Sequence, residues 1–371
     1  MNLCEVYTPA ILLDLNAMEH NLEKYAQEAK RHGKQLWPML KTHKSLELAR
    51  AQTNAGATGF LCGTLDEAEA LCAAGYRNLM YAYPVAAEPS VGRVLALAKK
   101  CNFIVRIDGL DAAAILNAAA ERADVTVGYT VIVDSGLHRF GVKPEEVAAF
   151  AEAMKQFGNL AFRGLSTHPG HVYGAGCKAD IPAYVEDERR AMKLAVEAVR
   201  SVGLEPEIVS SGTTPTFFGA VADGYINVYH PGNYIFNDAI QLSTETAAEG
   251  ECALTVLASV ISHPADGLFL CDAGAKCLGL DQGAHGNSSV RGFGVVVGHP
   301  ELTVAALSEE VGKLHVDGTT TLRVGDKIRI IPNHSCSSAN LTDYYVGVRG
   351  ETVDHLVKVD IRGNSTGKNV R

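Results

Sequence analysis

The sequence predicts an α/β fold, a (β/α)8 barrel of the TIM type, followed by a smaller all-β domain. Apolar runs alternate with helical stretches up to about residue 243, and short alternating runs with Gly-Asp, Asp-Gly and Gly-Glu pairs follow. Strands that alternate with helices form parallel βαβ units, whereas closely spaced short strands are typical of sandwiches and small barrels. We therefore expect a barrel over residues 8–243 and a β domain over residues 244–371, which residues 1–7 join.

Eight apolar runs supply the expected barrel strands. They begin near residues 36, 58, 79, 103, 126, 161, 207 and 226. A helix over residues 16–32 precedes them, and the helical stretches between them include 66–74, 111–122, 145–157 and 183–202. This alternation fits a closed barrel, although a doubly wound open sheet shares it. Pro38, inside the first run, is unusual because proline removes a donor from a strand ladder.

The region after residue 245 has a different pattern of apolar residues. Its short runs cover residues 252–262, 268–272, 293–297, 302–307, 326–332, 344–348 and 353–359, and little helix lies between them. Such a pattern predicts a sandwich or a small barrel.

Composition excludes several classes of function. The chain has 371 residues, 47% of them hydrophobic, and a net charge of −9, which disfavours nucleic acid and anionic membranes as partners. No apolar run approaches the roughly 20 residues needed to span a bilayer, and no signal peptide is evident. The nine cysteines are an odd number without a CxxC pair, so they predict buried thiols in a reducing compartment. We expect a cytoplasmic protein.

The stretch from Leu36 to Lys44 is the first candidate for chemistry. A mostly apolar run ends abruptly at Lys41, and polar residues lead into a helix that begins near Ser45. Barrels of this type keep their chemistry at the carboxyl ends of the strands. An amine held against an apolar wall loses hydration and becomes a usable nucleophile toward a carbonyl. Lys41 is therefore a candidate nucleophile; the alternative is that it and Lys44 are solvated loop cations.

Two loops near the end of the predicted barrel indicate an anion site. Residues 210–214 (Ser-Ser-Gly-Thr-Thr) follow the seventh strand, and residues 230–233 (His-Pro-Gly-Asn) follow the eighth. Small residues and hydroxyls at a helix start offer backbone N–H groups to an anion. Phosphate sites of such barrels commonly use the loops after the last two strands. Turns of this composition are also common without any ligand, which is the alternative.

Two further loops carry candidate polar groups. Arg139 lies after the fifth strand and presents planar donors that suit a carboxylate or an electron-poor ring. The loop after the sixth strand holds His168, His171 and Tyr173, and histidine suits proton transfer because it titrates near neutrality. The alternatives are a surface role for Arg139 and a structural role for either histidine.

The sharpest spacing is the sequence His334-Ser335-Cys336 in the β region. In an extended strand, residues i and i+2 point to the same face. One imidazole and one thiol on one side form half of a tetrahedral metal site, and zinc suits this pair best. The alternative is a buried cysteine beside an ordinary histidine, because two ligands alone bind a metal weakly.

Five motifs together carry a resemblance to a known family. They are Thr8-Pro9-Ala10 leading to Asp14, Lys41-Thr42-His43-Lys44, Asp134-Ser135-Gly136 with Arg139 and Gly141, Asp272-Ala273-Gly274 with Lys276, and Pro332-Asn333-His334-Ser335-Cys336. With them the chain resembles, over nearly its whole length, the D-threonine aldolase and D-serine dehydratase family. That family shares the fold-type III pyridoxal phosphate barrel of alanine racemase, so the resemblance implies an alanine racemase-like barrel here.

The resemblance also implies roles for individual residues. Lys41 would bind pyridoxal phosphate covalently, and Arg139 would face its pyridine nitrogen. The residues that would hold the phosphate and the ring substituents are Tyr173, Thr213, Thr214, Gly232 and Asn233. His334 and Cys336 would bind a divalent metal (zinc, manganese or magnesium), with water and substrate completing its shell. A homodimer is expected.

The implied function is a pyridoxal phosphate- and metal-dependent lyase that acts on β-hydroxy-D-amino acids, of the D-threonine aldolase type. D-serine dehydratase is a close alternative; an amino-acid racemase and a non-catalytic pyridoxal phosphate-binding protein are others. A metal would act on the β-hydroxyl as a Lewis acid, and Lys41 would remove the α-proton in a dehydratase. We expect His171 or His168 to relay protons.

Two departures from the family pattern stand out. Many members carry Arg-Pro-His where this chain has Trp37-Pro38-Met39, so the contacts just before Lys41 differ. Many also carry a histidine where this chain has Val311. The second departure bears on the choice of reaction, if that histidine assists catalysis or places the metal.

Overall fold

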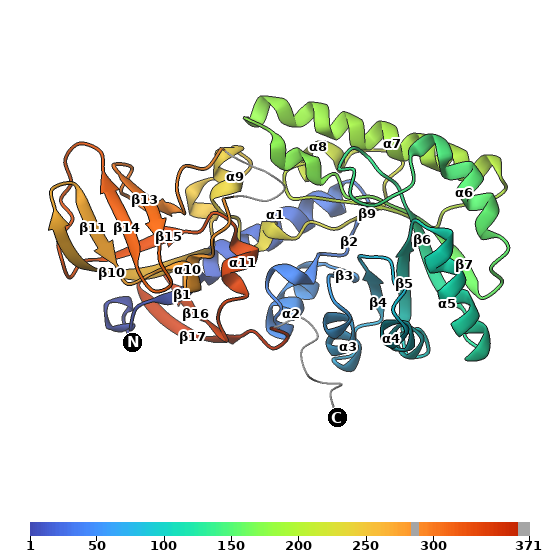
Figure 1. The fold of residues 1–371 in the computed structure, drawn as a ribbon, viewed down its shortest axis with the longest axis horizontal. Coiled ribbons are helices and arrows are strands. Elements are labelled where there is room, and N and C mark those ends of the chain that lie inside the picture. Colours follow the sequence, from blue (N-terminus) through green and yellow to red (C-terminus); the bar gives the residue numbers. More distant parts are fainter. Residues whose placement is uncertain (283–288, 363–371) are drawn as a thin grey trace.

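The structure, a computed structural model, describes residues 1–282 and 289–362. A barrel surrounded by helices lies beside a strand-rich domain (Figure 1). Among the described residues, no helix combines the length and the apolar character that crossing a membrane requires.

The predicted barrel strands are all present and parallel. They are β2 (Gln35–Leu36), β3 (Phe60–Cys62), β4 (Asn78–Tyr81), β5 (Asn102–Ile107), β6 (Val127–Ile132), β7 (Leu160–Ser166), β8 (Ile208–Ser211) and β9 (Val228–Tyr229). Their hydrogen-bonded order is β2-β9-β8-β7-β6-β5-β4-β3. A parallel bridge between Met39 and Leu61 brings the two ends of this sheet together. The prediction of a barrel, rather than an open sheet, is confirmed.

Pro38 explains why the first barrel strand is so short. The Trp37 N–H still donates to the Tyr229 carbonyl at 2.9 Å, and the Pro38 carbonyl accepts from the Leu61 N–H at 3.0 Å. Because proline has no N–H to donate, the regular ladder stops, and the chain turns into η2 (Leu40–Thr42). This turn carries Lys41.

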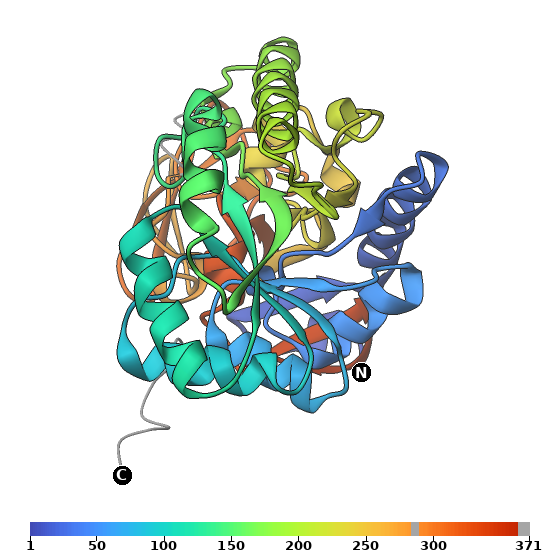
Figure 2. The ribbon, with the colours of Figure 1, turned by 90° about the vertical axis from the view of Figure 1, so that its right-hand side faces the viewer.

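Helices cover the outside of the barrel (Figure 2). They are α1 (Leu15–Arg31), α2 (Leu46–Ala55), α3 (Leu65–Ala73), α4 (Glu88–Ala98), α5 (Leu110–Arg122), α6 (Val147–Met154), α7 (Ile181–Ser201) and α8 (Phe217–Ala220). Strand side chains alternate between two cores, because neighbouring residues point to opposite faces. On β5, Phe103 and Val105 belong to the large core with the helices, whereas Ile104 joins a small cluster inside the barrel.

The β domain also matches its prediction in outline. Its strands are β1 (Ala10–Asp14), β10 (Leu254–Ala265), β11 (Leu268–Cys271), β12 (Val295–Val296), β13 (Leu302–Leu307), β14 (Gly312–Val316), β15 (Lys327–Ile331), β16 (Tyr344–Arg349) and β17 (Thr352–Lys358). β1 pairs with β10 and β16. The chain therefore runs with this sheet as far as Asp14, beyond the residues 1–7 that the sequence assigned to it. β14 was not predicted, because it is short and only Leu314 and Val316 in it are apolar.

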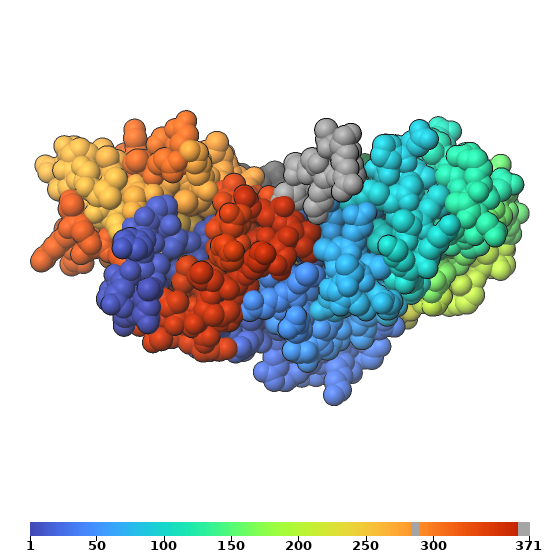
Figure 3. Space-filling model, turned by 90° about the horizontal axis from the view of Figure 1, so that it is seen from below, coloured from blue at the N-terminus to red at the C-terminus, as the bar shows by residue number. Residues whose placement is uncertain are grey.

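The β domain reaches the barrel mouth through one short helix. α11 (Ser335–Ala339) follows β15 and packs against η2. β17 contacts α2, and Figure 3 shows the carboxyl-terminal strands in red beside the blue amino-terminal part of the chain. These contacts bring residues near position 335 next to Lys41.

Candidate active site

A cavity lies at the carboxyl ends of the barrel strands, beneath α11. It is lined by Met39, Lys41, Thr42, Leu61, Arg106, Thr167, His168, Tyr173, Gly212, Thr213, Thr214, His230, Gly232, Asn233, His334 and Cys336. Most of the residues predicted from the sequence thus lie around one space. His171 and Arg139 are not among its lining residues.

Lys41 is held at the rim of the cavity by a buried frame. The Lys44 ammonium donates to Glu67 at 2.8 Å, and the other Glu67 oxygen accepts from the Gly63 N–H at 2.7 Å. A Cβ on Gly63 would lie only 3.0 Å from the Cβ of Lys41, so glycine makes room for the lysine. Lys44 is buried and paired, so the alternative of a solvated loop cation is wrong for it.

The two predicted anion loops are neighbours. A Cβ on Gly212 would lie 2.6 Å from the His230 backbone nitrogen, and one on Gly232 would lie 2.9 Å from the Thr42 hydroxyl. Thr213 and Thr214 are buried between them, and the Thr214 hydroxyl accepts from the Tyr234 N–H at 3.0 Å. A side chain at Gly212 would collide with the His230 backbone, and one at Gly232 with Thr42, so the two loops can lie this close only with glycine at both positions. The small residues, hydroxyls and close backbones of this cradle suit a phosphate.

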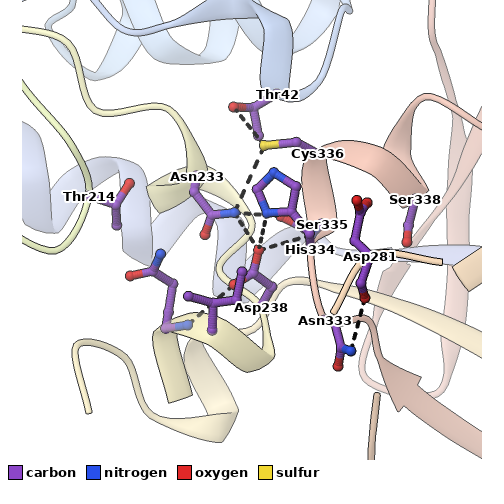
Figure 4. A network of polar contacts seen from close by, with 12 residues as sticks. Thr42, Thr214, Asn233, Asp238, Asp281, Asn333, His334, Ser335, Cys336 and Ser338 are labelled. Atoms are coloured by element: carbon purple, nitrogen blue, oxygen red, sulfur yellow. Dashed lines mark hydrogen bonds and ion pairs between the residues drawn. The ribbon is translucent and has the colours of Figure 1, made fainter. Parts of the chain in front are cut away.

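His334 and Cys336 face one another, but not from a strand. β15 ends at Ile331, and His334 is the N-cap of α11, so the expectation of an extended segment is wrong. Asp238 sets the turn: its Oδ2 accepts from the Ser335 N–H at 2.9 Å and lies 3.4 Å from His334 Nδ1 (Figure 4). The side chains of an N-cap residue and of the residue two positions later, in the first helical turn, can lie on the same side, as those of residues i and i+2 do in a strand.

In this pair, Cys336 and His334 each favour the charged form of the other. Burial alone would raise the pKa of the Cys336 thiol, but the His334 and Lys41 charges hold it below its usual value. Burial alone would lower the pKa of His334, but Cys336 and Asp238 hold it well above the usual value. The thiolate is the form of cysteine that binds metals, whereas His334 would have to lose its proton to bind one. No group of three or more His, Cys, Asp or Glu side chains in residues 1–282 and 289–362 is placed to hold a metal, so water and substrate would have to complete the shell.

The structure separates the two candidate histidines. His168 lines the cavity, and its Nδ1 lies 3.2 Å from the Gly212 carbonyl, which can only accept. His171 instead packs against Gly136 and against the Tyr184 ring, 5.2 Å between centroids. Tyr173 lines the cavity, and burial, with the nearby charges of Cys336 and Asp238, raises the pKa of its hydroxyl.

Arg106 is the residue that sequence reasoning missed. It lines the main cavity and also a smaller one beside it, which it shares with His168 and Arg139. Arg139 itself is exposed, with its guanidinium over the Phe140 ring at 5.4 Å from the centroid. The sequence did contain a signal. Arg106 is the single charged residue in the apolar run of β5, and it lies two residues after Ile104, so both side chains point to the same face.

Comparison with known proteins agrees with this geometry. A family model described as alanine racemase, N-terminal domain, matches residues 13–239, and one described as a putative serine dehydratase domain matches residues 253–348. The 3-hydroxy-D-aspartate aldolase of Paracoccus denitrificans (strain Pd 1222) is 31% identical over 98% of this chain and 94% of its own length. The chain belongs to the D-threonine aldolase and D-serine dehydratase family. Members of this family are pyridoxal phosphate-dependent lyases of D-amino acids with the alanine racemase-like barrel.

Solved structures of the family superpose closely. D-threonine aldolase from Filomicrobium marinum matches with a TM-score of 0.89 at 30% identity, over 98% of both chains. A mutant D-threo-3-hydroxyaspartate dehydratase, in which alanine replaces a cysteine, is described as a metal-free form; it matches with a TM-score of 0.90 at 28% identity, over 98% of this chain and 100% of that one.

The cavity fits the family's cofactor in its chemistry. Four buried lining atoms have no hydrogen-bond partner among the described residues: Arg106 Nη2, His230 Nε2, Asn233 Oδ1 and His334 Nδ1. Buried polar groups are normally satisfied, so these atoms indicate a polar ligand. A phosphate-bearing heteroaromatic aldehyde offers both an anion for the glycine cradle and polar ring atoms for the rest.

Proposed function

We propose that this protein is a metal-dependent lyase of β-hydroxy-D-amino acids, of the D-threonine aldolase type. The observation that supports this is the meeting of two reactive groups from different domains at one cavity. The Cys336 thiol lies 3.5 Å from the hydroxyl of Thr42, the residue after Lys41, and His334 lies beside it. A racemase or a storage protein has no evident need for an imidazole–thiol pair at the lysine.

Each residue then has a definite task. Pyridoxal phosphate, when bound, supplies an electron sink at the substrate's α-carbon. Lys41 would hold it covalently, and Thr213, Thr214 and the backbone at Gly232 would hold its phosphate. His334 and Cys336 would hold a divalent metal for the β-hydroxyl, and zinc best suits a nitrogen and sulfur pair.

His168, rather than His171, is our candidate for proton transfer. Its Nδ1–H donates to the Gly212 carbonyl, which leaves the lone pair on Nε2. His168 lines the same cavity as His334 and Cys336, so we infer that it takes the proton that an aldol cleavage removes from the β-hydroxyl.

A dehydratase reaction is the second candidate. It is favoured by the family model that matches residues 253–348, described as a putative serine dehydratase domain, and by the likeness to a D-threo-3-hydroxyaspartate dehydratase. Here Lys41 would remove the α-proton, and the metal pair would assist the departing hydroxide. The same residues serve both reactions, so products decide between them.

The test is a substrate panel with and without a chelator. Purified holoenzyme is given D-threonine, D-serine and D-threo-3-hydroxyaspartate, with the L-isomers as controls. We expect glycine and an aldehyde, with turnover lost in EDTA and restored by a divalent metal. A keto acid and ammonia would instead establish the dehydratase. Interconversion of D and L forms that ignores EDTA would refute both lyases.

Two further parts of the proposal concern the whole molecule. We propose a homodimer, with the barrel mouth against the partner's β domain, and a cytoplasmic location. Sedimentation of the holoenzyme tests the first, and cell fractionation tests the second.

A further inference from the structure

Glu188 is a buried acid that the proposed reaction does not use. It lies on α7 and is 0% exposed, beside the hydroxyls of Ser211 on β8 and Thr216 in the loop that follows. The ion pairs of α7 lie on its exposed side, such as that of Glu186 with Arg189, and Glu188 takes part in none within the described part of the chain. A buried carboxylate without a counter-charge is costly, which favours the uncharged acid.

The titratable neighbours of Glu188 favour the same form. Burial, opposed in part by the hydroxyls of Ser211 and Thr216 and assisted by the charge of Asp223, raises the pKa of Glu188 to about 7. Asp223 follows α8. On β9, Tyr229 faces Glu188 as a neutral hydroxyl, because burial raises its pKa as well. Neither neighbour is a cation, so any further negative charge nearby would hold the proton on Glu188 more firmly.

A chain of hydroxyls connects Glu188 with the cavity. Thr216 lies beside Glu188, and its Oγ1 is 3.0 Å from Oγ1 of Thr213, which lines the cavity. The Thr216 N–H also donates to Thr213 Oγ1, at 3.4 Å. Thr216 itself is buried and is not among the lining residues. Hydrogen bonding from Glu188 to a ligand in the glycine cradle would therefore pass through Thr216.

The proton on Glu188 decides which way these hydroxyls point, because each hydroxyl has one hydrogen to donate. If Glu188 is the acid, it can donate to Thr216, Thr216 can donate to Thr213, and Thr213 keeps its hydrogen for the cavity. If Glu188 is a carboxylate, which only accepts, Thr216 donates to it instead. Thr213 must then donate to Thr216 and turns a lone pair to the cavity. Only the first arrangement offers a donor to an anion.

We propose that Glu188 is a positioning residue for the cofactor phosphate: as the uncharged acid, it orders the hydroxyls of Thr216 and Thr213 so that Thr213 donates to the phosphate. The inference rests on the proposed function for the presence of a phosphate in the cradle. Its consequence is that phosphate and proton bind together. A dianion in the cradle favours the acid, and an ionised Glu188 repels the dianion. Affinity should therefore fall as the pH rises above neutrality.

The test is calorimetric binding of 4′-deoxypyridoxine 5′-phosphate to the cofactor-free, full-length protein. This ligand has the phosphate but no aldehyde, so it does not react with Lys41. From about pH 7 to about pH 8.5, affinity should fall about tenfold more for the unaltered protein than for Glu188→Gln. The amide of glutamine is uncharged at every pH and can still donate to Thr216, so at about pH 7 the two proteins should bind within about twofold. Titration of the ligand itself is common to both and cancels.

Calorimetry also counts protons directly. In two buffers that differ in ionisation enthalpy, at about pH 7.5, the unaltered protein should take up about half a proton more on binding than Glu188→Gln does. The matched control is Glu186→Gln, the same change on the exposed side of α7, which should keep the full pH dependence. A residue that only supports the fold would change affinity equally at every pH and would leave proton uptake unaltered.

Two further variants cut the chain of hydroxyls. Glu188→Met removes the donor, and Thr216→Val removes the link while it leaves Glu188 in place. Each should weaken binding by about tenfold at about pH 7, as the loss of one hydrogen bond to a charged group allows. Thr216→Val keeps the inference testable if a variant at Glu188 does not fold, and unchanged affinity in Thr216→Val would contradict it.

The inference is overturned if the unaltered protein and Glu188→Gln show the same pH dependence and the same proton uptake. It is also overturned if Glu188→Gln binds as weakly as Glu188→Met at neutral pH, because the amide would then not replace the acid as a donor. A ligand that does not bind the unaltered protein at all would refute the proposed function, and the inference with it. That outcome is distinct from equal pH dependence, in which binding is intact.

Discussion

The two ends of the cavity are built in opposite ways. At the roof, which we define as Asn233, Asp238, His334 and Cys336, a buried carboxylate joins the polar groups. The Asn233 amide donates to Asp238 at 2.6 Å, and Asp238 lies 3.4 Å from His334 Nδ1, although that atom and Asn233 Oδ1 make no hydrogen bond to a described residue. At the floor, formed by Arg106 and His230, no described carboxylate forms an ion pair with the guanidinium, and Arg106 Nη2 and His230 Nε2 have no hydrogen-bond partner among the described residues.

This difference indicates whether the side chains at each end are ordered before a ligand binds or only afterwards. A polar network that contains its own carboxylate is held in place before any ligand arrives, which is what a two-ligand metal site needs. An unsatisfied buried pair has a high free energy until a ligand supplies the missing acceptor. We therefore expect the roof to bind metal without the cofactor, and the floor to gain stability from the cofactor without the metal. The predictions below test this contrast.

Cys336→Ser should have the largest effect on turnover, because it removes one of the two proposed metal ligands at the roof and leaves the floor unchanged. We expect lyase turnover to fall by about a thousandfold or more, since Lewis-acid stabilisation is worth several kcal/mol. Bound metal should be lost while the visible absorbance of the cofactor stays. Metal analysis and spectra of the same sample check both, and Ser337→Ala is a neighbouring control. Loss of the cofactor together with the metal would contradict the independence of the two ends.

The floor should make the protein acid-sensitive through His230. In the folded protein the pKa of His230 is lowered to about 3 from 6.5. Between these pH values the unfolded chain binds a proton at this imidazole, whereas the native protein does not. Stability should therefore be lost as the pH falls from 6.5 to about 3, by about 4 kcal/mol from this group. Urea unfolding of the protein and of His230→Gln, at neutral pH and at about pH 4, measures it. His43, also shifted downward, is common to both proteins and cancels.

Behind the phosphate cradle, Glu188 should give the opposite pH dependence. Burial raises the pKa of this α7 carboxyl to about 7, although the hydroxyls of Ser211 and Thr216 lie beside it. Its contribution to stability is therefore present at acid pH and lost as the pH rises through about 7, by about 3 kcal/mol. Glu188→Gln should remove this loss in the same urea series. An unchanged difference between acid and alkaline stability would show that Glu188 is not the group responsible.

Asp238→Asn should have a smaller effect, confined to the roof. The neutral amide would weaken the contact to His334 Nδ1 and the cap on the Ser335 N–H. Metal affinity should fall by about tenfold, as is typical when a partner of a ligating histidine is altered. Metal titration of the cofactor-free protein measures it. The control is Asp281→Asn, the same change at a residue that contacts Asn333 only through its backbone carbonyl. An equal loss in both variants would point to general destabilisation.

Much of this arrangement is predictable because barrel topology converts sequence order into position. Once eight strands are counted, the residues at their carboxyl ends must meet, which places Lys41, Thr213 and Gly232 around one space. The pairing of His334 with Cys336 was predicted from their spacing, although the local structure is a capped helix rather than a strand. Asp238, which sets that helix, lies nearly a hundred residues earlier, and no local pattern connects the two.

Arg106 shows where the sequence alone does not suffice. A barrel strand is buried on both faces, so its side chains carry no alternation of apolar and polar residues that would tell inside from outside. Which residues of β5 point into the barrel is known only from the structure, where Ile104 lies in the barrel interior. Arg139 was the more conspicuous arginine because it lies in a polar loop, yet its side chain is exposed.

The central claim is that Lys41 binds the cofactor covalently. Borohydride reduction of the holoenzyme, followed by peptide mapping, tests it most directly. We predict that the reduced cofactor is found on the peptide that contains Lys41, and that Lys41→Ala, while still folded, has neither this adduct nor the visible absorbance. An adduct on another lysine, or an unaltered protein that is colourless and takes up no label, would contradict the account.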